Sequence, residues 1–374
     1  MSVQPFAALG QSDSAQPVEL AWFGCDLRTG QIIEDLRSLK PTGALTKRLG
    51  TATSTSFDLN VAGAGRDWLA ATDPGRSLLV GVDRLTDQPV WAGMTLTRDA
   101  GSSWTATLGT STPEAYLERR YTGDVTQFGQ DQAAVVTALM AAPLSQGPPF
   151  VMDAPSTGVL MDYTALDGDD RTVLSALQEV MGQDGGPEWT VDVAWSDTAH
   201  SGFVLPVRVR PAIGTQAADP EAVFDFPGCI SAYTLGESYE SGKGATAVVA
   251  RGEGEGTARL SSSGQVATDL EAAGWPRYVH RYTPSSGLTD PAQLTAHAVK
   301  ALALMKTGAQ VWTVEAVASQ APRLGRDWGI GDSIRVAVGS SPRHPAGTEI
   351  VARAWSWELD AAADRIVPVL IQED

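Results

Sequence analysis

The chain has 374 residues, of which 43% are hydrophobic and 19% charged, proportions typical of a folded protein with several domains. Its formal net charge of −17 argues against a nucleic-acid reader, because such a protein needs a basic face to neutralise phosphates. Cys25 and Cys229 are too few for a disulfide framework or a zinc site, so we expect both to be buried. The start lacks the basic head of a signal peptide and no window is apolar enough for a membrane span, so synthesis in the cytoplasm is expected.

The N-terminal part of the chain is predicted to be β-structure. Residues 1–17 are small and polar and predict a flexible arm. Residues 18–115 alternate short apolar runs with turn signals, as in WFGCDLRTGQII, and helical periodicity is scarce there. This pattern predicts a first small β-barrel.

The middle of the chain, residues 116–230, predicts an α+β domain. A helix is expected in DQAAVVTALM, where Asp131 can cap the start. A second is expected in DGDDRTVLSALQEVMG, where Asp169 or Asp170 can cap and Gly182 ends the apolar stripe. The acidic run could instead bind Ca²⁺, but it lacks the spaced oxygens and the distal Glu of an EF loop.

The last third returns to β-structure after one helix. Residues 231–310 predict strands followed by a helix at about 290–307, with Asp290 as cap and Pro291 at its first position. The buried stripe expected on this helix consists of Leu294, Ala298, Leu302 and Met305. Residues 311–374 predict the core of a second β-barrel.

The tetrapeptide GRDW occurs twice, ending at Trp68 and at Trp328. Each copy precedes an alternating apolar run, RSLLVGVD in the first case and DSIRVAV in the second, at an offset of 256. A second pair of strands, residues 90–99 and 351–360, matches at an offset of 261. Chance can produce short alternating runs, but the tetrapeptide, two matched strands and their order favour a duplicated β-domain.

The predicted fold is thus mainly β with an α+β middle, and two similar small β-barrels at the two ends flank helix-containing middle domains. This order of parts resembles the tail hub family, the baseplate hub proteins of tailed phages and related injection machines, and most nearly the minor tail proteins of siphophages with high-GC hosts. The stretches that carry the resemblance span most of residues 18–374 and are RSLLVGVDRLTDQPVWAGMTLTRD, DDRTVLSALQEVMGQDGGPEWTVDV, ATAVVARGEGEG, EAAGWPRYVHRY and LTDPAQLTAHAVKALALMKTGAQVWTVE.

The resemblance implies a homotrimer at the tail tip of a virion, whose six barrels form a pseudo-sixfold ring under a hexameric distal tail protein. It also implies contacts with a tape-measure protein and with other minor tail or fibre proteins, and passage of DNA through the ring. Trimer contacts would use barrel edges and aromatic side chains. The candidates are Trp91, Trp104, Trp355 and Trp357, each of which has ordinary core packing as its alternative.

No catalytic, metal or cofactor site is expected. The four histidines show no HExxH spacing, and GESYE at 236–240 lacks the closing glycine of a nucleophile elbow. Glu253 and Glu255 could form a glycosidase pair roughly 7 Å apart along a strand, but the flanking glycines favour a turn or bulge. Two alternatives stay open beside the hub: a distal tail or receptor- or cell-wall-binding tail protein, and a peptidoglycan hydrolase.

Overall fold

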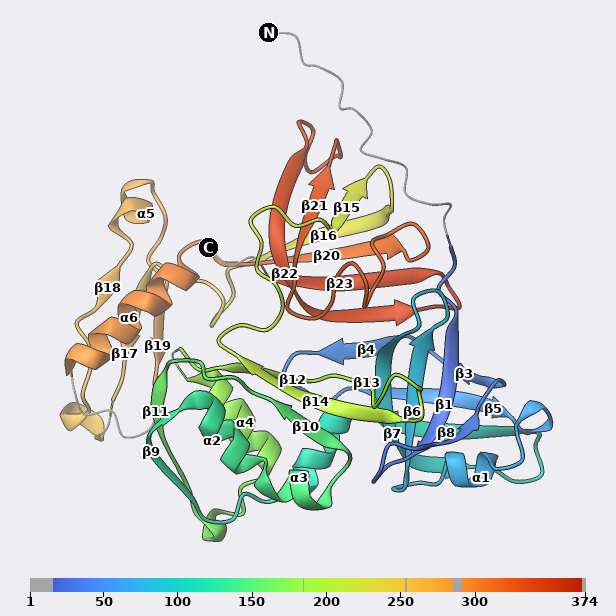
Figure 1. Ribbon diagram of the computed structural model, residues 1–374. Helices are drawn as coiled ribbons and strands as arrows, with labels where there is room; N and C mark the ends of the chain where they lie inside the picture. The colour runs from blue at the N-terminus through green and yellow to red at the C-terminus, as the bar shows by residue number, and fades with distance from the viewer. Residues whose placement is uncertain (1–15, 184, 253, 285–290, 372–374) are drawn as a thin grey trace. The chain divides into compact units, whose positions relative to one another are not determined.

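The computed structural model describes residues 16–183, 185–252, 254–284 and 291–371 (Figure 1). The chain forms two compact units. The first combines the stretch up to Tyr233 with the stretch from Val314 onward, and the second is Thr234–Thr313. A flexible arm is predicted for residues 1–17, and residues 1–15 of it lie outside the described residues.

The N-terminal sheet of the first unit has seven strands in the order β2-β1-β6-β7-β8-β5-β3. Their bounds are β1 Leu20–Asp26, β2 Ile32–Asp35, β3 Leu39–Pro41, β5 Ser54–Asn60, β6 Ser77–Asp83, β7 Gln88–Asp99 and β8 Thr105–Ser111. Strand β5 alternates buried and exposed side chains, as expected for a strand with one face in the core, whereas β6 is buried at every position because both of its faces are covered. Two short helices, η1 (Val61–Gly63) and α1 (Trp68–Ala71), connect β5 with β6.

The C-terminal sheet has the order β15-β21-β22-β23-β20-β16. Its strands are β15 Val223–Phe226, β16 Ile230–Ser238, β20 Ala309–Val317, β21 Ser333–Val338, β22 Thr348–Asp360 and β23 Arg365–Ile371. A further strand, β4 (Leu45–Arg48), comes from the N-terminal part of the chain and pairs antiparallel with the second half of β22, so the blue strand lies beside the red one in Figure 1. The two terminal segments therefore share one hydrogen-bonded ladder.

Five strands follow each other in the same order in both sheets. The sequence β6-β7-β8-β5-β3 corresponds to β21-β22-β23-β20-β16, and the hairpins β6–β7, β7–β8, β21–β22 and β22–β23 are all antiparallel. Both long strands carry an irregularity at the matching place, around Leu96 in β7 and around Trp355 in β22. A shared strand order with a shared bulge supports the duplication that GRDW suggested.

The pairing corrects the offset predicted for the second matched strand. Leu78 pairs with Met94, and its counterpart Ile334 pairs with Ala352. Met94 and Ala352 are 258 positions apart, so the offset of 261 matches residues that occupy different rungs. The two offsets differ by three, so the correct register exchanges the two faces of the strand. The alternation is a weak guide here because residues 91–95 and 352–354 are buried at every position.

The middle segment packs helices against small sheets. The sheet β10-β14-β12, with β13 also on β14, is formed by β10 Phe150–Asp153, β12 Glu188–Val191, β13 Ala194–Trp195 and β14 Phe203–Arg210. A two-stranded ribbon joins β9 (Val125–Asp131) to β11 (Leu160–Ala165). The helices are η2 Pro113–Arg119, α2 Gln132–Leu139, α3 Ala141–Gln146, η3 Asp167–Asp169 and α4 Val173–Gly182. Their core is continuous with the first sheet, since Val80 and Met94 cluster with Val136, Leu177 and Trp189.

The predicted helix starts in this segment are partly right. Asp131 caps α2 by accepting a hydrogen bond from the backbone N–H of Ala133, as expected. The caps predicted for α4 are wrong, because Asp169 and Asp170 belong to a separate turn, η3 and its end. Thr172 caps α4 instead and accepts from the N–H of Ser175 at 3.1 Å. The Asp run places three acceptable caps within four residues, so composition alone does not select among them.

The second unit, Thr234–Thr313, places one helix against a small sheet of order β18-β17-β19. Its elements are β17 Ala247–Ala250, η4 Gly256–Ala258, β18 Gln265–Val266, α5 Thr268–Ala272, β19 Val279–Tyr282 and α6 Pro291–Met305, while β16 and β20 lead in and out. Pro291 begins α6 as predicted, and Leu294 and Ala298 are buried against Val248 and Ala250. Asp290 lies outside the described residues. No described helix is both long and apolar enough to cross a membrane.

Candidate functional site

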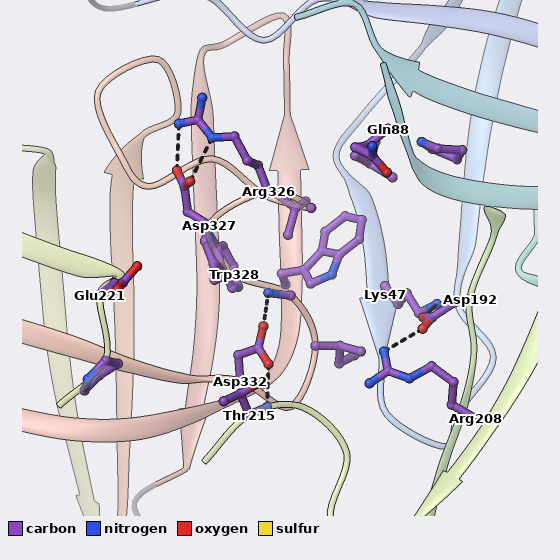
Figure 2. A pocket seen from close by; sticks show the side chains of 18 of the residues that line it. Lys47, Gln88, Asp192, Arg208, Thr215, Glu221, Arg326, Asp327, Trp328 and Asp332 are labelled. Carbon is purple, nitrogen blue, oxygen red and sulfur yellow. Dashed lines mark hydrogen bonds and ion pairs between the residues drawn. The ribbon is translucent and has the colours of Figure 1, made fainter. Parts of the chain in front are cut away.

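A groove of about 720 Å³ lies in the first unit where three parts of the chain meet (Figure 2). One wall comes from β4, the start of β7, the two residues after β12 and strand β14, and the other from residues 215–221 and the loop that contains the second GRDW. Its labelled polar side chains are Lys47, Gln88, Asp192, Arg208, Thr215, Glu221, Arg326, Asp327 and Asp332. The site is therefore polar and formed by segments far apart in sequence.

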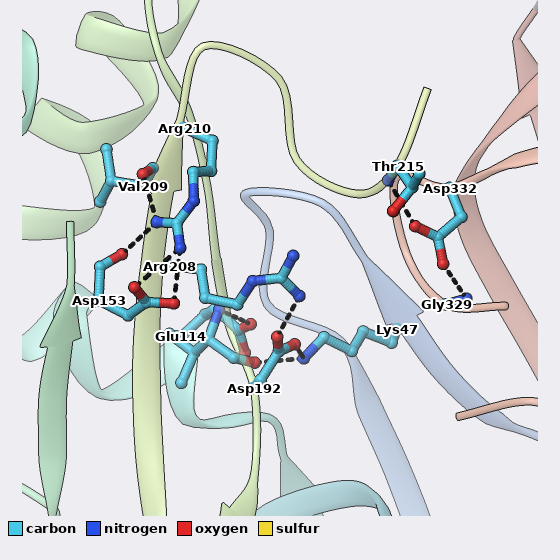
Figure 3. A network of polar contacts seen from close by, with 11 residues as sticks. Lys47, Glu114, Asp153, Asp192, Arg208, Val209, Arg210, Thr215, Gly329 and Asp332 are labelled. Carbon is cyan, nitrogen blue, oxygen red and sulfur yellow. Dashed lines mark hydrogen bonds and ion pairs between the residues drawn. The ribbon is translucent and has the colours of Figure 1, made fainter. Parts of the chain in front are cut away.

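Asp192 lies at the centre of the first wall, between two cations (Figure 3). Its Oδ1 accepts from Lys47 Nζ at 3.0 Å and its Oδ2 from Arg208 Nη1 at 2.8 Å. Lys47 also donates to the backbone carbonyl of Val191. Burial opposes ionisation of Asp192, but the charges of Lys47 and Arg208 outweigh it and lower the pKa of the carboxyl.

A second carboxyl, Glu114, is buried behind this wall (Figure 3). It is 1% exposed, and its Oε1 accepts from the N–H of Val191 at 3.4 Å. Its Oε2 has no hydrogen-bond partner among the described residues. Burial raises the pKa of Glu114, and the nearby charge of Lys47 counters this only in part.

The opposite wall is held by Asp332 in the loop after the second GRDW. Its carboxylate accepts from the N–H groups of Thr215 and Gly329 at 2.6 and 2.7 Å, so it ties the linker from the middle segment to this loop (Figure 2). Gly331 and Gly214 both have positive φ, and a Cβ on either would lie 2.2 Å from backbone atoms of the other strand. Glycine is required at both positions because the two backbones touch.

Two buried ion pairs connect the C-terminal segment to the rest of the first unit. Arg323 donates through Nε and Nη2 to Asp83 at 2.6 and 2.7 Å, and the two side chains are only 6% and 2% exposed. Arg353 also forms a two-point pair, in which Nη1 and Nη2 donate to the two carboxylate oxygens of Glu188 at 3.0 and 2.6 Å. Such bidentate pairs fix geometry as well as charge, so they hold β6 and β12 to the C-terminal sheet.

The tryptophans predicted as interface candidates occupy different environments. Trp91 is 1% exposed and packs on Trp22 and Phe57, and Trp357 is 2% exposed, so both belong to the core. Trp355 is half-buried beside Arg353, whose guanidinium lies 6.0 Å from the ring centroid. Trp104, in the turn before β8, is 71% exposed. It alone among the four presents most of its surface to solvent.

The two repeat markers also differ. Trp68 begins α1 and is half-buried, with the guanidinium of Arg98 5.7 Å from its ring centroid. Trp328 is 3% exposed, lines the groove and donates its indole N–H to the carbonyl of Pro322 at 2.9 Å. The tetrapeptide is thus shared while its two environments are not.

The two carboxyl groups at the first wall are either paired or buried. Asp192 is paired on both oxygens, and Glu114 does not reach the surface. No group of three His, Cys, Asp or Glu side chains within the described ranges is placed to hold a metal ion. Burial raises the pKa of the Cys229 thiol to about 12 and that of Cys25 further still, so neither is a ready nucleophile. Glu253 lies outside the described residues, and Glu255 is exposed at the start of η4.

The fold belongs to a class seen in tail proteins of phages and prophages. No known family profile and no curated protein matches the sequence. Among solved structures, the 43 kDa tail protein of prophage MuSo2 from Shewanella oneidensis is 13% identical with a TM-score of 0.58, and it covers 95% of this chain and 98% of its own. The tail protein from Neisseria meningitidis MC58 is 14% identical (TM-score 0.55; 95% and 97% covered), and prophage tail protein gp18 from Listeria monocytogenes EGD-e is 8% identical (0.53; 95% and 95%). At these identities the likeness shows a shared fold over the whole chain.

Neither this groove nor the connections that form it were predicted from the sequence. The buried pairs Arg323–Asp83 and Arg353–Glu188 and the Lys47–Asp192–Arg208 network join residues that no local pattern links. One signal was available: Gly331 and Asp332 follow the second GRDW after Gly329 and Ile330, and no Gly-Asp pair stands at that spacing after the first.

Proposed function

We propose that this chain is a structural protein of a phage tail tip, and that three copies form the baseplate hub that closes the tail tube. The observation that supports this most directly is the five-strand order that recurs at both ends of a chain whose whole fold resembles phage tail proteins. A threefold ring presents six comparable β surfaces only if each chain supplies two. The hub would connect a hexameric distal tail protein to tip components, in contact with the tape-measure protein, and open for DNA.

The buried connections of the first unit suit this role. Three chains form a pseudo-sixfold ring only if the two sheets of each chain keep a fixed position relative to each other. Sheets joined only by a flexible linker would not keep that position. Within the first unit, the ladder between β4 and β22 and the two buried arginine forks supply that connection. Trp104 is the candidate for a contact with a neighbouring subunit, because it is exposed on a turn at the end of a long hairpin.

The alternatives have less support. An enzyme would need a reactive group in a cleft, and the groove offers a carboxylate that is already paired twice. A distal tail protein or a receptor- or cell-wall-binding tail protein remains compatible with the fold. The two kinds of role differ in self-association, which is the quantity to measure.

The test is the mass and symmetry of the purified protein. Light scattering should give three times the 39.3 kDa chain mass for the protein alone, or three copies of the chain per hexamer in a complex with a hexameric distal tail protein. Averaged electron micrographs should show a ring with threefold symmetry. Trp104→Ala should weaken assembly without lowering the melting temperature. A protein that stays monomeric at high concentration and in the presence of the hexamer would contradict the proposal.

A further inference from the structure

Three aromatic rings form a partly exposed cluster in the second unit. The ring centroid of Tyr239 lies 5.2 Å from that of Trp275 and 5.2 Å from that of Tyr278. Trp275 is 44% exposed and Tyr278 is 47% exposed. Single exposed aromatics are common on protein surfaces, but a contiguous group of them marks a site that another molecule covers.

The cluster is held by backbone contacts on every side. Tyr239 lies against Gly244 and Gly308, where an added Cβ would come within 2.5 and 3.0 Å of its ring. The N–H of Trp275 donates to the carbonyl of Leu270 at 3.0 Å, and the N–H of Tyr278 donates to Thr246 Oγ1 at 2.8 Å.

Thr246 also anchors the loop between the two exposed rings, since its hydroxyl donates to the carbonyl of Pro276 at 3.2 Å. The loop is thus tied at three successive places. A ligand that stacks on these rings meets a surface already in place and loses little free energy in ordering it.

Three ion pairs involve residues next to the ring residues in the chain or bonded to them through the backbone, and their charges balance. Arg277, between the two exposed rings, pairs with Glu271 at 2.6 Å. Lys306, whose carbonyl accepts from the Tyr239 hydroxyl at 3.4 Å, pairs with Asp269 at 3.0 Å. A third pair, Lys243–Glu240 at 2.7 Å, follows Tyr239 directly in the chain. These three pairs therefore supply hydrogen-bond donors and acceptors with equal numbers of positive and negative charges.

We propose that the Tyr239–Trp275–Tyr278 cluster is a binding site for a neutral oligosaccharide. A pyranose ring presents C–H groups on its face and hydroxyls on its edge, so it stacks on an aromatic ring while the hydroxyls bond to charged or polar side chains around it. Half-exposed rings match the first part of that chemistry. The paired charges of Arg277 and Lys306, which are close to the rings in the chain or through a backbone hydrogen bond, supply polar groups for the second. The site lies wholly within the second unit and does not depend on the hub role.

The charges argue against two other ligands. An anionic polymer would need an excess of cations, whereas the three pairs cancel and the whole chain carries −17. A hydrophobic peptide or helix would need an aliphatic border, whereas the residues linked to these rings along the chain or through the backbone carry paired ions. A neutral ligand rich in hydroxyl groups fits both observations.

Calorimetric titration of the full chain with defined sugars tests the proposal. The neutral probes are hexamers of β-1,4- and α-1,4-linked glucose and a tetramer of β-1,4-linked N-acetylglucosamine. A galacturonate hexamer, equal in length to the glucose probes, is the anionic comparison. We expect at least one neutral sugar to saturate the protein. Trp275→Ala and Tyr278→Ala should each weaken its binding by about tenfold, while Trp275→Phe should retain part of it.

Phe128→Ala is the matched control, since it removes an aromatic side chain that is 67% exposed from the first unit and should bind the sugar as the wild type does. Thermal melts establish that every variant is folded. The proposal is overturned if none of the neutral sugars binds, if only the galacturonate binds, or if folded Trp275→Ala and Tyr278→Ala bind with unchanged affinity. The oligomeric state of the same samples is read separately, so the hub and the sugar site can fail independently.

Discussion

Replacing Arg323 by methionine tests whether the buried fork connects the two ends of the chain. In the wild type, both oxygens of Asp83 accept from the guanidinium, which also donates to the carbonyls of Gln16 and Pro17 at 2.9 and 3.3 Å. Arg323→Met leaves a carboxylate that is 2% exposed with one remaining partner, the N–H of Leu85. Removing one member of a buried ion pair costs about 3–5 kcal/mol, and we expect a loss of that size in the free energy of unfolding.

Urea denaturation followed by tryptophan fluorescence measures this loss. Arg326→Met is the matched control, because Arg326 lies in the same loop, pairs with Asp327 and has a side chain that is 56% exposed, so its loss should be below about 1 kcal/mol. The double variant Asp83→Leu with Arg323→Met should recover most of the stability, because it leaves no unpaired charge. The reasoning is refuted if Arg323→Met is no more destabilising than Arg326→Met, or if the double variant is less stable than Arg323→Met alone.

Three further predictions concern the groove and the tryptophans. Burial raises the pKa of Glu114, so ionisation of this carboxyl destabilises the folded protein once the pH exceeds the pKa of the unfolded chain. In urea titrations, the stability of Glu114→Gln relative to the wild type should therefore rise as the pH increases from about 4 to about 8. A difference that stays constant with pH would contradict this. Asp192, whose pKa is lowered, contributes stability that is lost as the pH falls, so the deficit of Asp192→Asn should be full at pH 7 and shrink below about pH 4. Trp91→Ala should cost about 3–5 kcal/mol because Trp91 is 1% exposed, whereas Trp104→Ala should change stability by less than about 0.5 kcal/mol; equal melting temperatures for the two would be the opposing result.

Sequence patterns predicted those helix starts and apolar helix faces that depend on neighbouring residues in the chain. The start of α2 at Asp131, the start of α6 at Pro291 and the apolar face of α6 at Leu294 and Ala298 all follow from capping and periodicity, and the structure confirms them. The mainly β character of the chain also follows from short alternating runs and frequent turn signals. In each case the evidence lies within about one helix or one strand of the residue concerned.

The connections could not be predicted in this way. Strand β4 pairs with β22, about three hundred positions further along the chain, and nothing in LTKR selects that partner over a neighbour in the first sheet. Asp83 and Asp192 look like ordinary strand-end acids, and only the fold brings Arg323 and Lys47 to them. The groove is formed by these pairings, and so it was not predicted from the sequence.

The unequal ends of the two sheets bear on how three chains could form a ring. At one end the first sheet continues through β1, antiparallel to β6, whereas the second continues through β15, parallel to β21. At the other end the first sheet stops at β3, three residues closed by Pro41, whereas the second stops at the nine residues of β16. A short strand and an edge proline both discourage further pairing, so the two edges offer a neighbour different lengths of backbone. In the proposed ring a sixfold partner would therefore meet two alternating kinds of edge, and its equivalent contacts would have to lie on the central strands that both sheets share.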